Sequence, residues 1–409
     1  MDTRKKPNIN VPEGFTLFYN VYTNRWALRP IEGYSKKYLS KNTFTPKKEV
    51  IEKKDSSKNG NNSLTNAKRA KNDEFYTTLE DIVNELQHYK EHFKDKVVYC
   101  PCDKVYNLGR SEFFNYFVVN FHKLGLKKVI CSQYNPVGKG VMSIYDGRGV
   151  KWEYNGEPYK SSPIDESEVD TEFFNGDGSF DSAECQKLMR ECDIIVTNPP
   201  FSLFRQFIAQ MFSYGKQFLV IGNQNAITYK EIFPYIKNNQ LWLGYNTPKN
   251  FRVPLDKVED EKKQFEIDGV VYQTFGNICW FTNLPHKKRY EELDLDKSYN
   301  ETDYPKYDNY DAIEVSKVSD IPTDYNGIMG VPITFLGKYC PTQFEIIGCA
   351  DADIVPTDWK GMSAEFIKTY YAQGNTGSYK EGNRLASYIH DGIAKVPYKR
   401  ILIRRKSFN

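Results

Sequence analysis

The strongest constraint on the fold is an alternation of short apolar runs with single helical patterns between residues 73 and 236. Four of the runs fit buried strands, namely Lys96–Cys100, Lys128–Cys131, Asp193–Thr197 and Gln217–Gly222. Parallel strands need a long crossover, which a single helix supplies. The alternation therefore predicts an α/β fold with a doubly wound, mainly parallel sheet that helices cover on both faces. Such sheets bind ligands at the carboxyl ends of their strands.

The alternation ends near residue 245, where charged, Tyr-rich and Pro-rich segments with few clear helices begin. The 409 residues are enough for two to three domains of roughly 150 residues each. We expect an N-terminal extension at 1–71, the sheet domain at 72–245 and an irregular second domain at 246–409. Within the extension, residues 15–22 and 25–30 predict a short hairpin.

Charge is distributed unevenly along the chain. Residues 1–71 hold 16 Lys and Arg against 6 Asp and Glu, a net +10, so the remaining 40 and 47 leave residues 72–409 at −7. The second half of the extension, Lys41–Lys71, is rich in Lys, Asn and Ser without periodicity. This composition is typical of a solvated tether that can touch phosphates, or of a tail that serves only solubility.

The sequence also bears on the compartment. No apolar run approaches the roughly 20 residues that span a bilayer, and no apolar signal core follows the first residues. The eight cysteines are few for this length and lie mostly in apolar stretches, which indicates reduced thiols rather than a disulfide framework. We therefore expect a cytoplasmic protein with no membrane partner.

The apolar run Asp193–Thr197 leads into Asn198-Pro199-Pro200-Phe201, the string that carries the most chemical information. The prolines fix their own φ angles, and Pro199 offers a carbonyl but no N–H. The Asn198 amide oxygen and the Pro199 carbonyl can therefore form a preset pair of acceptors for the two hydrogens of an exocyclic amine. Holding both hydrogens favours a pyramidal nitrogen whose lone pair can attack a methyl group in line.

Phe201 can stack on the heterocycle that carries this amine. An amine inside duplex DNA is out of reach, so the base must be flipped out at a cost of about a few kcal/mol. Stacking of about 1–3 kcal/mol and the new hydrogen bonds offset that cost. The alternative interpretation of the string is an Asn-Pro-Pro turn after an edge strand.

Several strings resemble, in order, the EcoRI-type adenine-specific DNA methyltransferases. They are Asp73–Thr77, His88–Cys100, Asn198–Arg205, Asn223–Glu231, Tyr304–Ala312 and Asp324–Pro332. The resemblance implies methyl transfer from S-adenosylmethionine to N6 of adenine. It also implies a Rossmann-like cofactor-binding and catalytic domain at 72–245 and a target-recognition domain at 246–409.

The resemblance implies roles for individual residues. Asn198, Pro199, Pro200 and Phe201 correspond to the catalytic motif. The residues expected to bind S-adenosylmethionine are Phe75, Tyr76, Thr77, Cys100, Cys102, Asp103, Asp177, Phe180 and Asn198. For the segment 75–77, a helix cap with aromatic core residues is the alternative.

The cofactor region departs from the family pattern in several places. The turn after Cys100 contains no glycine before Gly109, and Cys131-Ser-Gln133 stands where an acidic residue commonly accepts the ribose hydroxyls. The carboxylate expected near the cofactor's adenine amine is Asp177 or Asp181. We favour Asp177, because Asp181 is the better helix cap.

Zinc is the competing chemistry to consider. His88, His92, Cys100 and Cys102 lie within 15 positions, but one residue between the cysteines is fewer than structural sites use, and both thiols end a buried strand. We expect no metal. The expected partners are double-stranded DNA and, acting separately, a cognate restriction endonuclease, and the protein is expected to be a monomer. The alternatives are a methyltransferase acting on RNA or protein glutamine, and a DNA-binding protein without methylation activity.

Overall fold

The computed structural model describes residues 76–102, 112–135, 147–157, 170–253, 264–267, 270–351 and 354–406, and the backbone of 15–20 and 25–30. The chain divides into two compact units, Met1–Asn66 with Val105–Arg110, and Ala67–Lys104 with Ser111–Asn409. In the first unit, β1 (Phe15–Asn20) and β2 (Arg25–Pro30) pair antiparallel, as in the expected hairpin. The tether expected over 41–71 lies outside the described residues.

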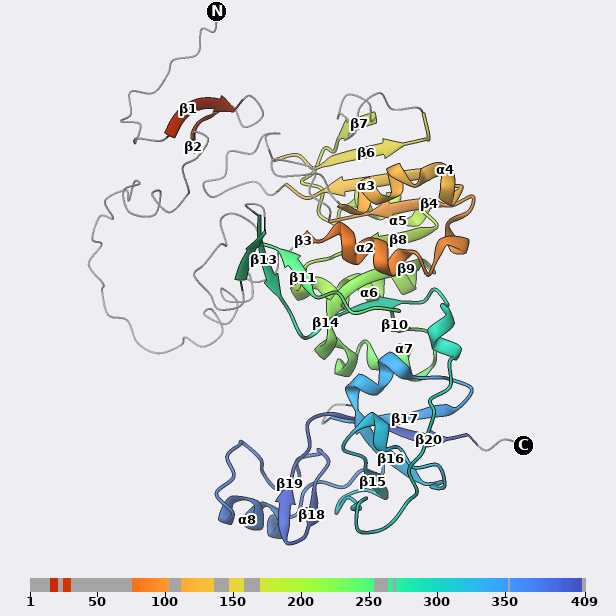
Figure 1. The fold of residues 1–409 in the computed structure, drawn as a ribbon, viewed down its shortest axis with the longest axis vertical. Coiled ribbons are helices and arrows are strands. Elements are labelled where there is room, and N and C mark those ends of the chain that lie inside the picture. The colour runs from red at the N-terminus through yellow and green to blue at the C-terminus, as the bar shows by residue number, and fades with distance from the viewer. Residues whose placement is uncertain are drawn as a thin grey trace, which may run out of the picture. The chain divides into compact units, whose positions relative to one another are not determined.

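The second unit is built around an eight-stranded sheet (Figure 1). In spatial order its strands are β10 (Trp242–Leu243), β14 (Ile278–Thr282), β9 (Gln217–Asn223), β8 (Ile194–Thr197), β4 (Val97–Cys100), β5 (Lys128–Gln133), β6 (Val150–Tyr154) and β7 (Asp170–Phe173). The four strands expected from the sequence are parallel and lie at the centre. The strands at both margins are antiparallel to their neighbours. The sheet is therefore mixed rather than mainly parallel. The prediction rested on strands that alternate with helices, and antiparallel neighbours need no crossover helix.

Helices lie on both faces of this sheet. Successive strand residues point to opposite faces, so Trp280 and Phe281 of β14 mark the two sides. The ring of Phe113 in α3 (Glu112–Val119) lies 6.1 Å from that of Trp280, and the ring of Phe204 in α6 (Phe204–Ser213) lies 5.0 Å from that of Phe281. Helix α2 (Leu79–Leu86) packs beside α3, and α5 (Ala183–Glu191) shares the buried cluster of α6.

A small antiparallel sheet joins an early segment of the chain to a late one. Its order is β12 (Gln264–Ile267), β13 (Val270–Thr274), β11 (Asn250–Arg252) and β3 (Tyr76–Thr77). Tyr76 lies opposite Arg252, and Thr77 lies opposite Phe251. Strands that follow residue 245 therefore complete sheets begun before it.

A further four-stranded sheet lies in the C-terminal part, in the order β15 (Ala312–Glu314), β16 (Ile328–Pro332), β20 (Arg400–Arg405) and β17 (Phe344–Ala350). Strands β15 and β16 are parallel, and the other neighbours are antiparallel. Helix α8 (Ala364–Ala372) and the hairpin of β18 (Tyr388–His390) and β19 (Ile393–Lys395) accompany this sheet. The segment expected to be irregular thus contains a regular sheet of short strands.

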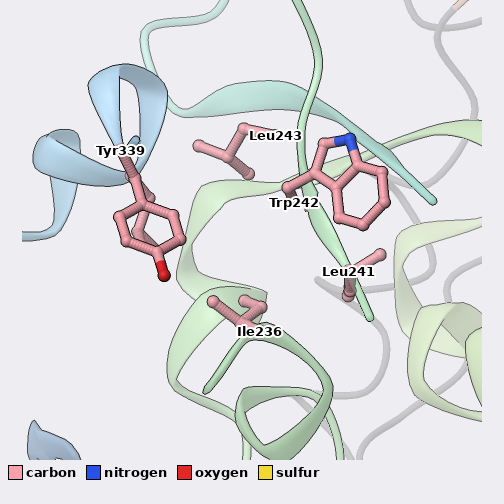
Figure 2. A pocket seen from close by; sticks show the side chains of 6 residues that line it. Ile236, Leu241, Trp242, Leu243 and Tyr339 are labelled. Carbon is pink, nitrogen blue, oxygen red and sulfur yellow. The ribbon is translucent and has the colours of Figure 1, made fainter. Parts of the chain in front are cut away.

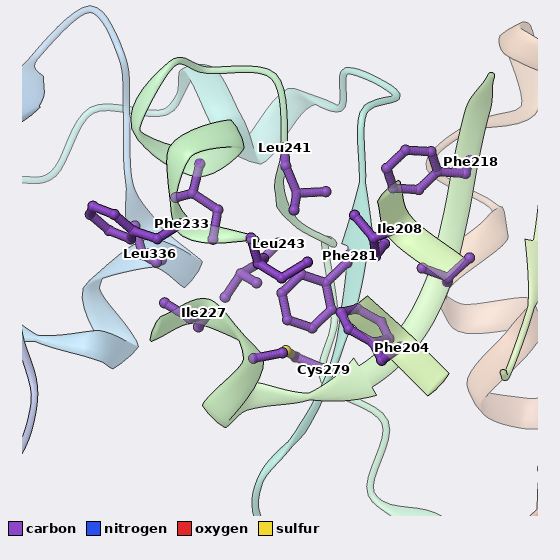
Figure 3. Packing of buried hydrophobic residues seen from close by; sticks show 14 of the residues in the cluster. Phe204, Ile208, Phe218, Ile227, Phe233, Leu241, Leu243, Cys279, Phe281 and Leu336 are labelled. Carbon is purple, nitrogen blue, oxygen red and sulfur yellow. The ribbon is translucent and has the colours of Figure 1, made fainter. Parts of the chain in front are cut away.

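One buried apolar cluster continues from the large sheet into the C-terminal sheet. Figure 3 shows Phe233 of α7 (Phe233–Lys237), Leu243 of β10 and Leu336 of η9 (Ile333–Lys338) among its members. Ile401 and Ile403 of β20 belong to the same cluster, so the two sheets share a core. The remaining short helices are η2 (Lys90–Phe93), α4 (Phe121–Leu124), η4 (Phe201–Leu203), η5 (Gln224–Thr228), η7 (Lys287–Tyr290) and η8 (Val318–Asp320).

Candidate active site

The carboxyl ends of β4 and β8 meet in the middle of the large sheet. From β4 the chain passes to β5 on one side, and it later returns to β8 on the other side. Thr197, the last residue of β8, donates its hydroxyl to the carbonyl of Pro101, which directly follows β4. A point where the strand order reverses in this way is where open α/β sheets bind ligands.

The Asn198–Phe201 string begins at this junction. Pro199 is buried, whereas Asn198, Pro200 and Phe201 are half-buried. Phe201 opens η4, which leads directly into α6, and Phe204 anchors that helix in the core. The string is therefore held at both ends by buried structure and keeps accessible surface between them.

The turn after β4 uses a cysteine where a glycine was expected. Cys102 has φ 61°, in the left-handed region that residues with a Cβ rarely adopt. Cys100 and Pro101 are buried and Cys102 is half-buried. The chain thus makes a tight turn beside Asn198 without glycine. Asp103, also expected to contact the cofactor, lies outside the described residues.

Residues 174–181 dock on the carboxyl end of β5. Asn135 donates its N–H to the carbonyl of Asp177 at 2.8 Å. Gly178 has φ 75°, and a Cβ there would lie 2.5 Å from the carbonyl oxygen of Gln133, so the close approach requires glycine. Asp177 therefore lies beside the end of β5, where its Oδ1 accepts the N–H of Ser179 at 3.0 Å.

The prediction that Asp181 caps the helix is wrong. Ser182 caps α5 by accepting the N–H of Cys185 at 3.2 Å, because its hydroxyl is the one that reaches the open first turn. Asp181 instead accepts the hydroxyl of Ser179 at 2.5 Å. The helix cap therefore gives no reason to prefer Asp177 over Asp181 as the carboxylate near the cofactor. The position of Asp177 beside the end of β5 is the observation that favours it.

Two further side chains near β5 face the interior. Phe180 is 5% exposed, and its ring centroid lies 5.3 Å from that of Phe207 in α6. Ser132, in the segment where a ribose contact is expected, is buried with its hydroxyl 2.7 Å from that of Tyr99. Tyr134, by contrast, is exposed at the end of the strand.

Tyr76 and Thr77 form β3, which pairs with β11. Thr77 is buried, and its hydroxyl has no hydrogen-bond partner within the described residues. A buried hydroxyl without a partner costs free energy, so such a group is a place to look for a ligand or a water molecule. Phe75, which precedes it, lies outside the described residues.

The two histidines weighed as zinc ligands make other contacts. The His88 ring stacks on Tyr245 at 3.5 Å, and His92 Nε2 lies 2.9 Å from the Pro285 carbonyl oxygen. In the described ranges, no group of three or more His, Cys, Asp or Glu side chains could hold a metal ion.

A small apolar pocket lies between the large sheet and η9 (Figure 2). Its lining residues are Ile236, Leu241, Trp242, Leu243, Leu336 and Tyr339. Arg289 covers the Trp242 ring at 3.8 Å. None of the residues expected to bind substrate or cofactor lines this pocket, so it is separate from the junction of β4 and β8.

Comparison with known proteins assigns the chain. Residues 63–406 match the family described as Adenine-specific methyltransferase EcoRI. The chain belongs to this family. The Type II methyltransferase M.EcoRI of Escherichia coli is 48% identical over 294 residues, which cover 70% of this chain and 89% of that protein.

Two mycoplasma relatives extend the comparison. Type II methyltransferase M.MpnI of Mycoplasma pneumoniae is 43% identical over 290 residues, covering 69% of this chain and 84% of its own length. Type II methyltransferase M.MgeORF184P of Mycoplasma genitalium is 39% identical over 336 residues, covering 80% and 97%. No solved structure matches the chain.

Membership of the EcoRI-type family confirms the prediction of an adenine-specific methyltransferase, for which S-adenosylmethionine is the implied methyl donor. The roles of individual residues stay predictions. Sequence reasoning did not single out Thr197 and Pro101, whose contact joins the two sides of the junction, because 96 positions separate them. None of the helices in the described ranges has the length and apolarity to traverse a bilayer.

Proposed function

We propose that this chain is a site-specific DNA methyltransferase that transfers a methyl group from S-adenosylmethionine to N6 of a flipped-out adenine. The observation that carries the proposal is the contact of Thr197 with Pro101, which brings the Asn198–Phe201 string to the reversal point of the sheet. That position is the ligand site of doubly wound sheets.

We propose the corresponding layout of the second unit. The central parallel strands and the helices on both faces support a Rossmann-like, doubly wound sheet as the catalytic domain at 72–245. Residues 246–409 then form the target-recognition domain. Since β11 and β14 join sheets with β3 and β9, this domain is built onto the catalytic domain rather than attached through a linker.

The residues around the junction fit S-adenosylmethionine. Thr77 offers a buried hydroxyl that has no hydrogen-bond partner among the described residues, and Asp177 offers a carboxylate beside the end of β5. Cys100, Cys102, Tyr76 and Phe180 line the same region in this proposal. The family resemblance adds Phe75 and Asp103, which lie outside the described residues. When bound, the donor supplies a methyl group on a sulfonium, which needs no Lewis acid.

The Asn198–Phe201 string then receives the base. The Asn198 amide oxygen and the Pro199 carbonyl accept the two hydrogens of the adenine amine, and Pro200 keeps the backbone rigid. The ring of Phe201 stacks on the flipped adenine, which offsets the loss of stacking in the duplex. The string therefore holds the amine with its lone pair free.

Double-stranded DNA is the proposed partner, and the extension 1–71, with its net charge of +10, adds attraction to phosphates. The relatives are named Type II methyltransferases, so we propose a restriction-modification role with any cognate endonuclease acting separately. A monomer in the cytoplasm, where DNA and the donor are both present, completes the proposal.

Asn198→Ala tests the proposed mechanism. It removes one of two acceptors for the amine, so we expect methylation in a single turnover to slow by roughly 10²–10³, as for loss of one preorganised contact at a reacting centre. The measurement is incorporation of labelled methyl groups into unmethylated genomic DNA, followed by mapping of N6-methyladenine. Thermal unfolding at the parental temperature serves as the control for folding.

Two results would contradict the proposal in different ways. A variant that methylates DNA at the parental rate would show that Asn198 is not catalytic. Label transferred by the parent protein to RNA or to protein glutamine, but not to DNA, would show that the acceptor is wrong.

A further inference from the structure

Helix α2 grips the segment that connects the large sheet to β11. Glu85 of α2 is fully buried, and its carboxylate accepts the N–H groups of Tyr245 and Asn246, each at 2.7 Å. The hydroxyl of Tyr89, one turn along, donates to the same carboxylate at 2.8 Å. The first two bonds span 160 and 161 positions of the sequence, so they serve tertiary structure rather than the helix itself.

Helix α2 contacts further residues of the segment between Tyr245 and Asn250. Asn246 also donates its side-chain amide to the carbonyl of Asn84 at 2.7 Å. The backbone N–H groups of Lys249 and Asn250 face the carboxylate of Asp81, one turn before Glu85, and oppose the rise that burial gives its pKa. Asn250 is the first residue of β11, so the carboxylates of α2 hold both the turn and the start of the strand that follows.

The turn at 244–246 is closed from other sides as well. Gly244 sits so close to its neighbours that a Cβ there would lie 2.4 Å from Glu85 Oε1 and 2.5 Å from Trp280 Cβ. The Tyr245 ring lies under His88, and Lys288 donates to the Tyr245 carbonyl at 2.8 Å. With its N–H, carbonyl and ring all engaged, Tyr245 has little freedom.

The position of this segment bears on the cofactor region through strand pairing. Strand β11 pairs with β3, and β3 is followed directly by Thr78, which caps α2 by accepting the N–H of Asp81 at 3.2 Å. Strand β3, helix α2 and the segment 244–252 thus form a closed loop of contacts. Glu85 supplies the most buried of those contacts.

We infer that Glu85 is a positioning residue that locks the 244–246 turn to α2 and, through the β11–β3 pair, sets Tyr76 and Thr77 in the geometry that receives S-adenosylmethionine. The last step rests on the proposed function, whereas the lock itself does not. Removing the carboxylate takes away the acceptor of two N–H groups in a half-buried turn, which frees the turn and β3 without touching the Asn198–Phe201 string.

The experiment compares Glu85→Ala, Glu85→Gln and a matched control, Ile82→Val, which lightens a fully buried side chain on the same helix without touching the turn. Hydrogen exchange of the ligand-free proteins measures the lock directly. We expect faster exchange at 244–252 and 76–77 in Glu85→Ala, an intermediate rate in Glu85→Gln, which keeps one acceptor oxygen, and no local change in Ile82→Val.

Calorimetric titration with S-adenosylmethionine measures the consequence. We expect Kd to rise on the order of tenfold in Glu85→Ala, as loss of a hydrogen-bonded buried group implies, with partial rescue in Glu85→Gln. KM for the donor should rise in step, while kcat at saturating donor stays near the parental value, because the residues proposed to hold the amine are unchanged.

The outcomes separate the inference from the proposed function. Unchanged exchange at 76–77 in Glu85→Ala, or an equal loss of affinity in Ile82→Val, would overturn the inference, because the effect would then be general loosening of α2. A parent protein that fails to bind S-adenosylmethionine would overturn the proposed function, and the exchange data would still decide whether Glu85 locks the turn.

Discussion

Glu85 and Glu314 are both buried carboxylates, and the two regions that contain them hold the charge in different ways. Glu314 of β15 faces Arg400 of β20, whose Nη2 lies 2.6 Å from Oε1, and the Tyr307 hydroxyl donates to Oε2 at 2.5 Å. Glu85 accepts two backbone N–H groups and the Tyr89 hydroxyl. The C-terminal sheet thus neutralises its carboxylate with a cation, whereas the β3–α2 region solvates its carboxylate with dipoles.

The different partners of the two carboxylates determine how each contributes to stability. Burial raises the pKa of Glu85 to about 7, although hydrogen bonds from Asn246, Tyr245 and Tyr89 work in the opposite direction. An ion pair such as Glu314 with Arg400 ties two strands together only while both partners are charged. Glu314 thus links two strands through an ion pair, whereas Glu85 holds a turn that loses stability as Glu85 ionises.

The largest effect on stability is expected when the ion pair of Glu314 with Arg400 is removed. Glu314→Ala leaves the mostly buried guanidinium of Arg400 without its partner, which should lower the free energy of unfolding by about 3–5 kcal/mol. Urea unfolding measures this loss. The matched control is Glu345→Ala, which breaks the more exposed pair with Arg404 on the same sheet and should cost about 1 kcal/mol or less. Equal losses in the two variants would show that burial does not distinguish the pairs.

A smaller effect is expected from pH at Glu85. Because its folded pKa is raised from 4.5 to about 7, the folded state keeps a proton that the unfolded state releases. The stabilising contribution is therefore full below pH 4.5 and is lost as pH rises to about 7, a change of about 3 kcal/mol for one group. The comparison of parent and Glu85→Gln across this range isolates the change.

That comparison is needed because His286 titrates in the opposite sense. Burial lowers the pKa of His286 to about 4, so the unfolded state takes up the proton first and stability rises with pH between 4 and 6.5. Tyr89 donates its hydroxyl to Glu85, whereas the cations Arg289, Lys288 and His88 act on His286. His286 therefore offsets part of the Glu85 slope in the parent, and the difference in stability between parent and Glu85→Gln should slope with pH. A difference that is constant with pH would mean that Glu85 stays ionised throughout.

The same contrast explains what the sequence could predict. The four central strands were recognisable because each is a buried apolar run followed by a helix, and the Asn198–Phe201 string was recognisable because it follows one of them. The antiparallel strand β14 is not part of that alternation with helices, so it left no comparable signal. The sequence showed that the Gly-rich turn of the family pattern is absent after β4, but only the structure shows that Cys102 adopts a left-handed conformation there.

The contacts of Glu85 and Glu314 were out of reach for a physical reason. Glu85 lies on α2 among residues of ordinary amphipathic spacing, and its partners are backbone N–H groups, which every residue but proline carries. Glu314 meets Arg400 86 positions later. Pairing over such separations depends on the register of the sheets, which a local pattern does not encode. The resemblance pointed to Thr77, but only the structure shows that its buried hydroxyl has no partner among the described residues.

The smallest effect on stability is expected at a third carboxylate, Asp351, which is paired with a partly exposed cation. Lys399 lies 2.7 Å from Asp351 and also donates to the Thr228 hydroxyl at 2.5 Å, with about a third of its side chain exposed. Water can replace such a cation, so Lys399→Ala should cost about 0.2–1 kcal/mol, and a double-mutant cycle with Asp351→Asn should give a coupling of the same size. Salt should reduce this coupling but leave the loss in Glu314→Ala nearly unchanged, because buried pairs are screened much less. A coupling between Lys399 and Asp351 that persists in 1 M salt would show that this pair behaves like the buried pair of Glu314 with Arg400. Side-chain exposure would then not distinguish screened from unscreened ion pairs.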